Sequence, residues 1–214
     1  RGSDTSVGFG FAPVLWDAEQ GITRVELTRA EGGFDVRFPA PIESTAGGAL
    51  YAITFRTRVF LQSTTFRLEF ARDGIDGVVQ AAGEGDATDV VSSGSMSVVS
   101  DLEGVPLLDE LSIAKAVITP NGDGINDELT IGLSVFHVEG EKPIVLEIFD
   151  LSGRRVRDLT RVQSNPSGDH TFVWDGRDES GRLPPPGNYI IRAAVVADGT
   201  IGTVSRTRIV GLVY

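Results

Sequence analysis

Alternation of apolar and polar residues with a period of two is the feature that most limits how this 214-residue chain can fold. In Ala49–Leu61, for example, the apolar Tyr51, Ile53 and Phe55 fall on one face, and the polar Thr54, Arg56 and Arg58 fall on the other. A period of two places the apolar side chains on one face of a β-strand and leaves the other face in water. No window keeps the i, i+3, i+4, i+7 apolar stripe of an amphipathic helix. The sequence therefore predicts an all-β protein.

Turn-forming residues separate the predicted strands at regular intervals. We expect a hairpin in which the first long strand turns back through Ser63–Thr64, with Phe66, Leu68 and Phe70 facing inward. Asp109–Ala116 is the best helix candidate, with a plain linker as the alternative. Strands are predicted over Thr23–Thr28, Phe34–Phe38, Ala49–Leu61, Thr65–Phe70, Val78–Ala82, Ser95–Val99, Glu128–Val135, Ile144–Asp150, His170–Trp174, Asn188–Ala197 and Thr203–Tyr214.

The strand spacing and the charge both divide the chain in two. Residues 1–112 carry 8 basic and 17 acidic residues, whereas residues 113–214 carry 11 and 13. The regular turns of the second half are typical of an antiparallel sandwich of about seven strands. We therefore predict two consecutive β-sandwich domains, an acidic one over 1–112 and a second one over 113–214.

Composition limits the partners and the chemistry. The net charge of −11 argues against nucleic acid and against anionic membrane surfaces as partners. The absence of cysteine excludes disulfides and thiolate metal sites. No apolar run approaches the ~18 residues of a membrane-spanning helix, so no membrane span is predicted.

A short loop of the second half has the composition of a calcium site. Oxygen-bearing side chains stand at its positions 1, 3 and 7, a backbone carbonyl is available at position 5, and glycines allow the loop to close around an ion. The alternative is a tight turn whose side chains only cap their own backbone. Asp150 or Asp175 is the expected further ligand. The candidate calcium ligands are Asn121, Asp123, Ile125, Asn126 and Asp127.

Other residues with a chemical interpretation have stronger structural ones. Trp174 offers a surface for sugar stacking, but a tryptophan at the end of a strand more often fills a sandwich core; Trp16 is less clear. Arg154 and its neighbours form either a basic docking site or solvated hairpin residues. His137 and His170 are the two histidines, and no G-x-S-x-G motif accompanies them. We predict no catalytic residues and no enzyme activity.

Three segments of the second half resemble a known family when they are taken in order. They are ITPNGDGIND (Ile118–Asp127), IFDLSGRRVR (Ile148–Arg157) and WDGRDESGR (Trp174–Arg182), the last running into PPGNY (Pro185–Tyr189). Together they resemble the immunoglobulin-like module of flagellar hook-capping proteins and the related C-terminal modules of gliding-motility-associated and type IX-secreted surface proteins. The resemblance covers about 118–214. It implies an immunoglobulin-like, non-catalytic domain of an extracellular or cell-surface protein.

The two ends of the chain suggest how such a protein would associate. Val7–Phe11 is apolar and glycine-spaced, and Thr203–Tyr214 is a long β-branched strand. An extended segment of one copy can add to an open sheet of another, and repetition of that contact builds a filament. We therefore expect a structural subunit that associates with itself or with other surface proteins. The alternatives are a carbohydrate-binding or adhesion module and a secretion-sorting tail of a larger protein.

Overall fold

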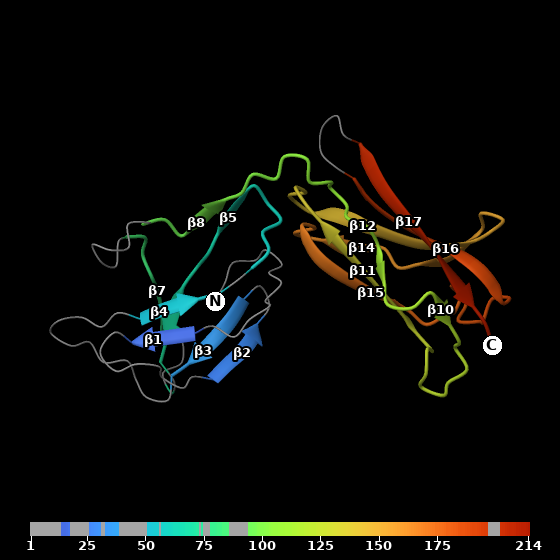
Figure 1. Cartoon of the computed structure of the whole chain (residues 1–214), viewed down its shortest axis with the longest axis horizontal. Coiled ribbons are helices and arrows are strands. Elements are labelled where there is room, and N and C mark those ends of the chain that lie inside the picture. The colour runs from blue at the N-terminus through green and yellow to red at the C-terminus, as the bar shows by residue number, and fades with distance from the viewer. Residues whose placement is uncertain are drawn as a thin grey trace. The chain divides into compact units, whose positions relative to one another are not determined.

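The computed structural model describes residues 14–17, 26–30, 33–38, 51–55, 57–72, 74, 78–85, 94–196 and 202–214. The chain divides into two compact units, Arg1–Asp101 and Leu102–Tyr214 (Figure 1). We expected the boundary later, at 112/113. Leu108 and Leu111 belong to the buried core of the second unit, so the segment that holds them packs with the second unit. Among the described residues no helix is long and apolar enough to cross a membrane.

The described part of the first unit consists of antiparallel strand pairs. Each pair is a separate two-stranded sheet. The pairs are β1 (Val14–Asp17) with β4 (Tyr51–Thr54), β2 (Glu26–Ala30) with β3 (Gly33–Arg37), β5 (Ser63–Thr65) with β8 (Ser97–Val99), and β6 (Glu69–Ala71) with β7 (Val79–Ala81).

The predicted hairpin of the first unit is wrong. The strand expected to reach Leu61 ends at Thr54, and the expected turn residues Ser63 and Thr64 belong to β5, which pairs with the distant β8. Phe70, expected to face inward, is 47% exposed. Alternation reports only that a segment is extended, whereas the choice of partner depends on residues far away in the sequence.

The second unit is a sandwich of two sheets (Figure 1). The larger sheet has the order β10-β17-β16-β12-β13, with β14 also paired to β12, and the smaller sheet has the order β15-β11-β9. The strands are β9 (Ser112–Ile113), β10 (Val117–Ile118), β11 (Leu129–Val135), β12 (Lys142–Asp150), β13 (Arg155–Asp158), β14 (Arg161–Gln163), β15 (Gly168–Trp174), β16 (Gly187–Val196) and β17 (Thr203–Leu212).

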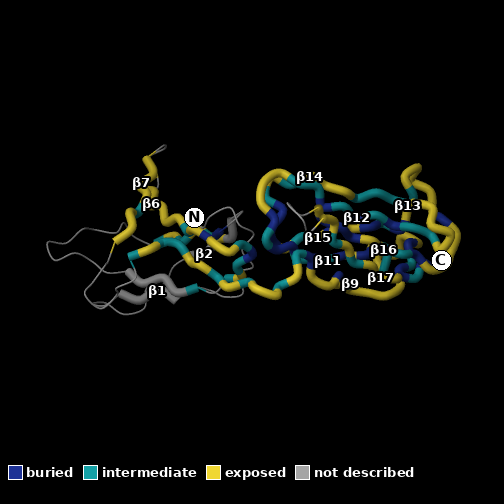
Figure 2. The backbone as a smooth tube through the Cα atoms, turned by 90° about the horizontal axis from the view of Figure 1, so that it is seen from above, coloured by how far each residue is buried: buried dark blue, intermediate teal, exposed yellow. Residues whose placement is uncertain are grey.

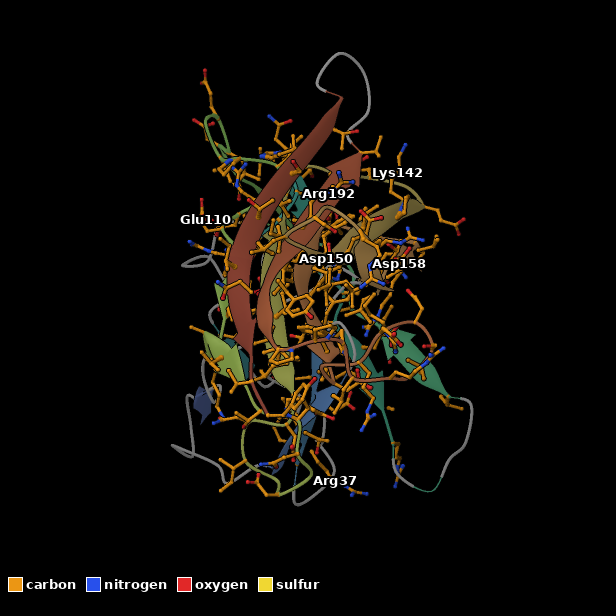
Figure 3. The ribbon with its side chains drawn as sticks, turned by 90° about the vertical axis from the view of Figure 1, so that its right-hand side faces the viewer. Arg37, Glu110, Lys142, Asp150, Asp158 and Arg192 are labelled. Carbon is orange, nitrogen blue, oxygen red and sulfur yellow. The ribbon has the colours of Figure 1, made fainter. Side chains whose placement is uncertain are left out.

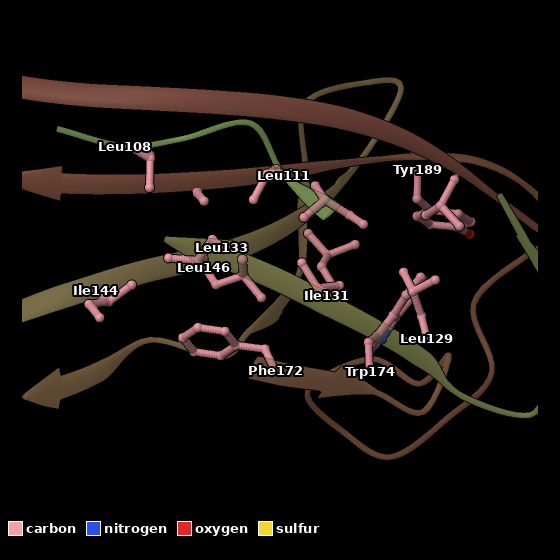
Figure 4. Packing of buried hydrophobic residues seen from close by; sticks show 14 of the residues in the cluster. Leu108, Leu111, Leu129, Ile131, Leu133, Ile144, Leu146, Phe172, Trp174 and Tyr189 are labelled. Atoms are coloured by element: carbon pink, nitrogen blue, oxygen red, sulfur yellow. The ribbon is translucent and has the colours of Figure 1, made fainter. Parts of the chain in front are cut away.

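Alternating burial along the strands forms the core of this unit. In β11 every second side chain from Leu129 to Val135 is buried, and in β16 Tyr189, Ile191 and Ala193 face the same interior. Figure 2 shows this alternation of buried and exposed positions, and Figure 4 shows the apolar side chains of the two sheets meeting between the ribbons. Burial of this apolar surface is the main force that holds the sheets together.

The connectivity is immunoglobulin-like, and it corrects one prediction. The helix candidate Asp109–Ala116 is wrong: this segment runs along β11, contains β9, and is followed by β10, which crosses to the other sheet and pairs parallel with β17. The hydroxyl of Tyr189, near the start of β16, donates a hydrogen bond to the carbonyl of Pro185. Such a tyrosine corner is a recurrent feature of immunoglobulin-like sandwiches. The predicted all-β, immunoglobulin-like fold class is confirmed.

Candidate functional site

The three sequence segments that carry the family resemblance meet at one end of the second unit. In the larger sheet, Asp150 at the end of β12 is paired with Tyr189 near the start of β16. The two sheets also approach each other here: a Cβ added at Gly176 would lie 2.8 Å from Cγ of Pro120 and 3.1 Å from a methyl group of Leu212. Segments from three separate stretches of the chain therefore build one loop cluster, which we call the turn cluster: 119–128, 150–154 and 175–186.

One turn motif, Asp-x-Ser-Gly-Arg, occurs twice in the turn cluster. In Asp150–Arg154, Oδ1 of Asp150 accepts hydrogen bonds from the backbone N–H groups of Ser152 (3.0 Å) and Arg154 (3.0 Å) and from the Ser152 hydroxyl. In Asp178–Arg182, Oδ1 of the aspartate accepts the equivalent three bonds at 2.9, 2.9 and 2.7 Å. Both glycines have positive φ angles, 85° and 77°. The serine and the glycine are therefore required by the turn itself.

Hydrogen bonds lower the pKa of the aspartates in these turns. The Ser152 hydroxyl, followed by the Arg154 side chain, lowers the pKa of Asp150 to about 2. The Ser180 hydroxyl, followed by the Arg182 backbone, lowers the pKa of Asp178. A group whose pKa is held this low is ionised at neutral pH and accepts protons poorly. These carboxylates stabilise turns and are unsuited to acid–base catalysis.

The loop predicted to bind calcium is a turn closed by its own side chains. The carboxylate of Asp127 accepts the N–H groups of Gly122 and Gly124, both at 2.7 Å, and these bonds lower the pKa of Asp127. Oδ1 of Asp123 accepts the N–H of Ile125 at 2.7 Å. Oδ1 of Asn121 accepts the N–H of Asp123, so the side chains of Asn121, Asp123 and Asp127 all bind the backbone of the loop.

Other atoms proposed as calcium ligands also have partners. The carbonyl of Ile125 accepts the Thr119 hydroxyl (3.1 Å), and the carbonyl of Asn126, a residue with φ of 59°, accepts the N–H of Thr119 (2.8 Å). Asp150 accepts the N–H of Ser152 in its own turn, and Asp175 accepts the N–H of Arg177. In the described part of the chain no group of three or more His, Cys, Asp or Glu side chains is arranged to hold a metal. The calcium site stays a prediction.

The arginines of the predicted docking site lie in different environments. Arg154 pairs with Asp150, Arg155 pairs with Glu147 and Asp158 on the sheet surface, and Arg157 donates to the carbonyl of Asp178. Their contacts are therefore internal to the unit.

Trp174 and His170 have structural contacts. Trp174 is fully buried, and its indole N–H donates to the carbonyl of Arg177 at 2.9 Å, which confirms the core interpretation. A ring nitrogen of His170 lies 2.7 Å from the carbonyl of Pro166, and burial lowers the pKa of this histidine. Trp16 lies in β1, but its side chain is outside the described residues.

Sequence reasoning missed two features of the turn cluster that left a signal in the sequence. The repeat of Asp-x-Ser-Gly-Arg at 150 and 178 is visible in the letters alone. A tyrosine shortly after a proline-rich turn, at the start of a strand, indicates the Tyr189 corner.

A shallow depression of about 240 Å³ lies between Asp150–Arg154 and Pro185–Tyr189. It is smaller than the roughly 300–1,000 Å³ of most ligand sites.

The aspartates of the turn cluster predict acid sensitivity. The pKa of Asp150 falls from 3.8 to about 2 on folding, and those of Asp178 and Asp127 also fall. A lowered folded-state pKa contributes stability above the unfolded value that is lost as the pH falls through the folded value. We expect the free energy of unfolding to be steady down to about pH 5 and to decline toward pH 2. Urea unfolding at a series of pH values measures it.

Asp150→Asn should lower stability at pH 7 and reduce this acid dependence, because asparagine cannot gain a proton. The exposed Glu139→Gln is the matched control, with little effect on stability expected. Identical pH profiles for Asp150→Asn and the unaltered chain would contradict the role given to this turn.

Comparison with known proteins agrees with this architecture. Residues 130–199 match the family model described as the FlgD Ig-like domain. The chain is 33% identical over 82 residues to the basal-body rod modification protein FlgD of Salmonella typhimurium and, equally, to that of Salmonella typhi. The matched part is 37% of this chain and 35% of each relative, so the chain spans about a third of their length.

Solved structures similar to this chain include FlgD and PorU. FlgD from P. aeruginosa is 23% identical, with a TM-score of 0.31 over 52% of this chain and 74% of that one. Dimeric latent PorU from Porphyromonas gingivalis is 14% identical, with a TM-score of 0.39 over 99% of this chain and 17% of that one. The family match and the strand order together show that the second unit resembles the immunoglobulin-like domain of FlgD.

Proposed function

We propose that this chain is a non-enzymatic structural protein of a bacterial cell-surface assembly, located outside the cell, and that its second unit is a building module. The match of residues 130–199 to the FlgD Ig-like domain is the observation that carries the proposal. The relatives named above are rod modification proteins of the basal body, a structural assembly. The proposal transfers to this chain only the structural character of that role.

The chemistry of the turn cluster supports a structural role. Asp127, Asp150 and Asp178 direct their oxygen atoms to N–H and hydroxyl groups of their own turns. Carboxylates used in this way fix loop geometry and have little capacity for proton transfer. A rigid sandwich with rigid loops suits a module that must present a surface of constant shape.

We propose further that the module associates by strand addition along β17. The N–H of Gly211 faces β10, where it binds the carbonyl of Ala116. Because alternate residues of a strand direct their N–H and C=O groups to the same side, Thr203, Ser205, Thr207 and Ile209 face the same edge. β10 pairs only with the last two residues of β17. An added strand would find a row of main-chain donors and acceptors along this edge.

Charged side chains give this edge selectivity. Arg206 and Arg208 alternate with the edge-facing residues, and both lie near Glu110, with N–O distances of 3.9 and 2.9 Å. Inward-pointing charges on an edge strand discourage indiscriminate pairing. Val7–Phe11 is the proposed donor on sequence grounds, and it lies outside the described residues.

The carbohydrate-binding alternative loses one of its two aromatic candidates, because Trp174 lies in the core. A secretion-sorting tail remains an alternative and predicts that residues 113–214 direct export of a fused reporter.

Negative-stain electron microscopy of the intact chain tests the proposal. We expect regular polymers, and we expect deletion of residues 1–12 to abolish them if Val7–Phe11 is the donor. Loss of polymers in a chelator would implicate the Asn121–Asp127 loop in calcium binding. Dispersed particles under all conditions would contradict assembly as the function, and polymers that survive the deletion would contradict this donor.

A further inference from the structure

The outward face of the larger sheet carries more apolar surface than a solvated face requires. In β12 the inward Ile144, Leu146 and Ile148 are fully buried, while Val145 and Phe149 lie on the opposite face and are only partly exposed. An antiparallel sheet with one face in water normally alternates apolar and polar residues. β12 instead carries apolar residues on both faces, and Glu147 is the one charged residue among the outward positions 143, 145, 147 and 149.

Strand register joins these residues to others as rows across the face. Phe149 is paired with Ile190, and Ile190 with Ile209, so three large apolar side chains lie side by side on neighbouring strands. Ile209 is 63% exposed. Near the opposite end of the face, Pro143 is paired with Val162, which is 64% exposed. Phe149, Ile190 and Pro143 are partly buried, so each row joins one exposed apolar residue to partly buried ones. Adjacent apolar residues that reach the surface can mark an interaction site.

An ion-pair cluster lies between these two apolar rows. Glu147 is paired across the strands with Arg192, and their side chains are 3.1 Å apart. Arg155 lies 3.0 Å from Glu147 and 3.1 Å from Asp158. Figure 3 labels Arg192 and Asp158 on this sheet. The cluster contains two cations and two anions, so its net charge is zero, although the whole chain carries −11.

We propose that this face, built from the outward side chains of β12, β13, β14, β16 and β17, binds the same face of a second copy of the chain. The neutral charge of the ion-pair cluster indicates which partner can bind this face. A uniformly acidic or basic partner would meet like charge on half of the cluster, whereas a two-fold related copy can place each carboxylate near an arginine and each apolar row against another. This contact is separate from strand addition at the β17 edge and goes beyond the proposed function.

The size of the face sets the expected strength. The five strands occupy four positions across the sheet, because β13 and β14 both pair with β12, at different parts of that strand. Four positions about 4.8 Å apart and eight residues of about 3.3 Å each give roughly 500 Å² per copy. Standard interfaces bury about 800 Å² per partner. The structure therefore points to a weak dimer that depends on concentration. Because the contact is isologous, association stops at two copies, whereas strand addition continues.

Sedimentation velocity over a concentration series tests the inference. The parent for this experiment is the full-length chain carrying Thr207→Pro, because proline at the edge of β17 blocks strand addition and leaves only the face contact. Glu147→Lys changes the net charge of the cluster from 0 to +2, and Arg192→Glu changes it from 0 to −2. We expect this parent chain to dimerise. Each charge-exchange variant, made in the same parent, should stay monomeric alone over the same range, and an equimolar mixture of the two variants should recover the dimer. Circular dichroism confirms that each variant is folded.

A matched pair of apolar-to-charged substitutions separates this face from general surface effects. Ile209→Lys, on the proposed face, should abolish the dimer. Val173→Lys, on β15 of the other sheet and 43% exposed, should leave it intact. A chain that is monomeric at every concentration, a dimer that Glu147→Lys or Ile209→Lys leaves unchanged, or a variant mixture that stays monomeric would overturn the inference. Polymers seen by electron microscopy would test strand addition at the β17 edge and would not test the dimer formed by this face.

Discussion

Replacement of Trp174 by alanine is expected to lower the free energy of unfolding by about 3–5 kcal/mol, the usual range for deleting a buried tryptophan side chain. Trp174 is fully buried and packs edge-on against Tyr189, with ring centroids 5.7 Å apart. Its indole N–H also satisfies the carbonyl of Arg177, which would be left without this donor. The packing and the hydrogen bond that are lost lie at the end of the sandwich that carries the turn cluster.

Urea unfolding followed by circular dichroism measures this effect. Trp174→Phe retains most of the volume and loses the hydrogen bond, so about 1–2 kcal/mol is expected. Leu151→Ala is the surface control, since Leu151 is 65% exposed, and should stay within about 0.5 kcal/mol. A Trp174→Ala variant as stable as the unaltered chain that fails to bind glycans would instead favour the carbohydrate-binding alternative.

Replacement of Thr207 by proline is expected to abolish strand addition while preserving the fold. The N–H of Thr207 faces the open edge of β17, so its loss removes no bond to β16. Proline blocks pairing at a strand edge because it lacks the donor and its ring occupies the approach. Polymers counted by electron microscopy should disappear, with little change in the urea midpoint.

The neighbouring residue provides the control for Thr207→Pro. The N–H of Arg208 faces β16, so Arg208→Pro breaks a bond inside the sheet, and it also removes the ion pair with Glu110. This variant should be clearly less stable than Thr207→Pro. If both proline variants are equally destabilised, the assignment of the two edges of β17 is wrong. If Thr207→Pro still forms normal polymers, association uses another surface.

The long strands of the second unit were predictable because each buries one whole face. Segments predicted over Glu128–Val135 and Asn188–Ala197 form β11 (Leu129–Val135) and β16 (Gly187–Val196), where alternation in the letters matches alternation in burial. Alternation of this kind follows directly from the geometry of a half-buried strand.

Short elements could not be predicted in the same way. β9 and β10 contain two residues each, too few to show a period, and they exist because β11 and β17 offer them partners. The structure of the candidate calcium loop could not be predicted from its composition either. The composition of Asn121–Asp127 shows which oxygen atoms the loop contains, but the direction in which those atoms point depends on backbone conformation, including the positive φ of Gly122 and Gly124.

The exchange of individual backbone amides tests the central claim, that the second unit is an assembly module with an open β17 edge. Hydrogen exchange resolved by residue should show fast exchange at Thr203, Ser205, Thr207 and Ile209 in the dispersed chain, and slow exchange at the even-numbered residues between them. On assembly the four fast amides should become protected. Four amides that exchange equally fast in the dispersed and the assembled chain would contradict the account.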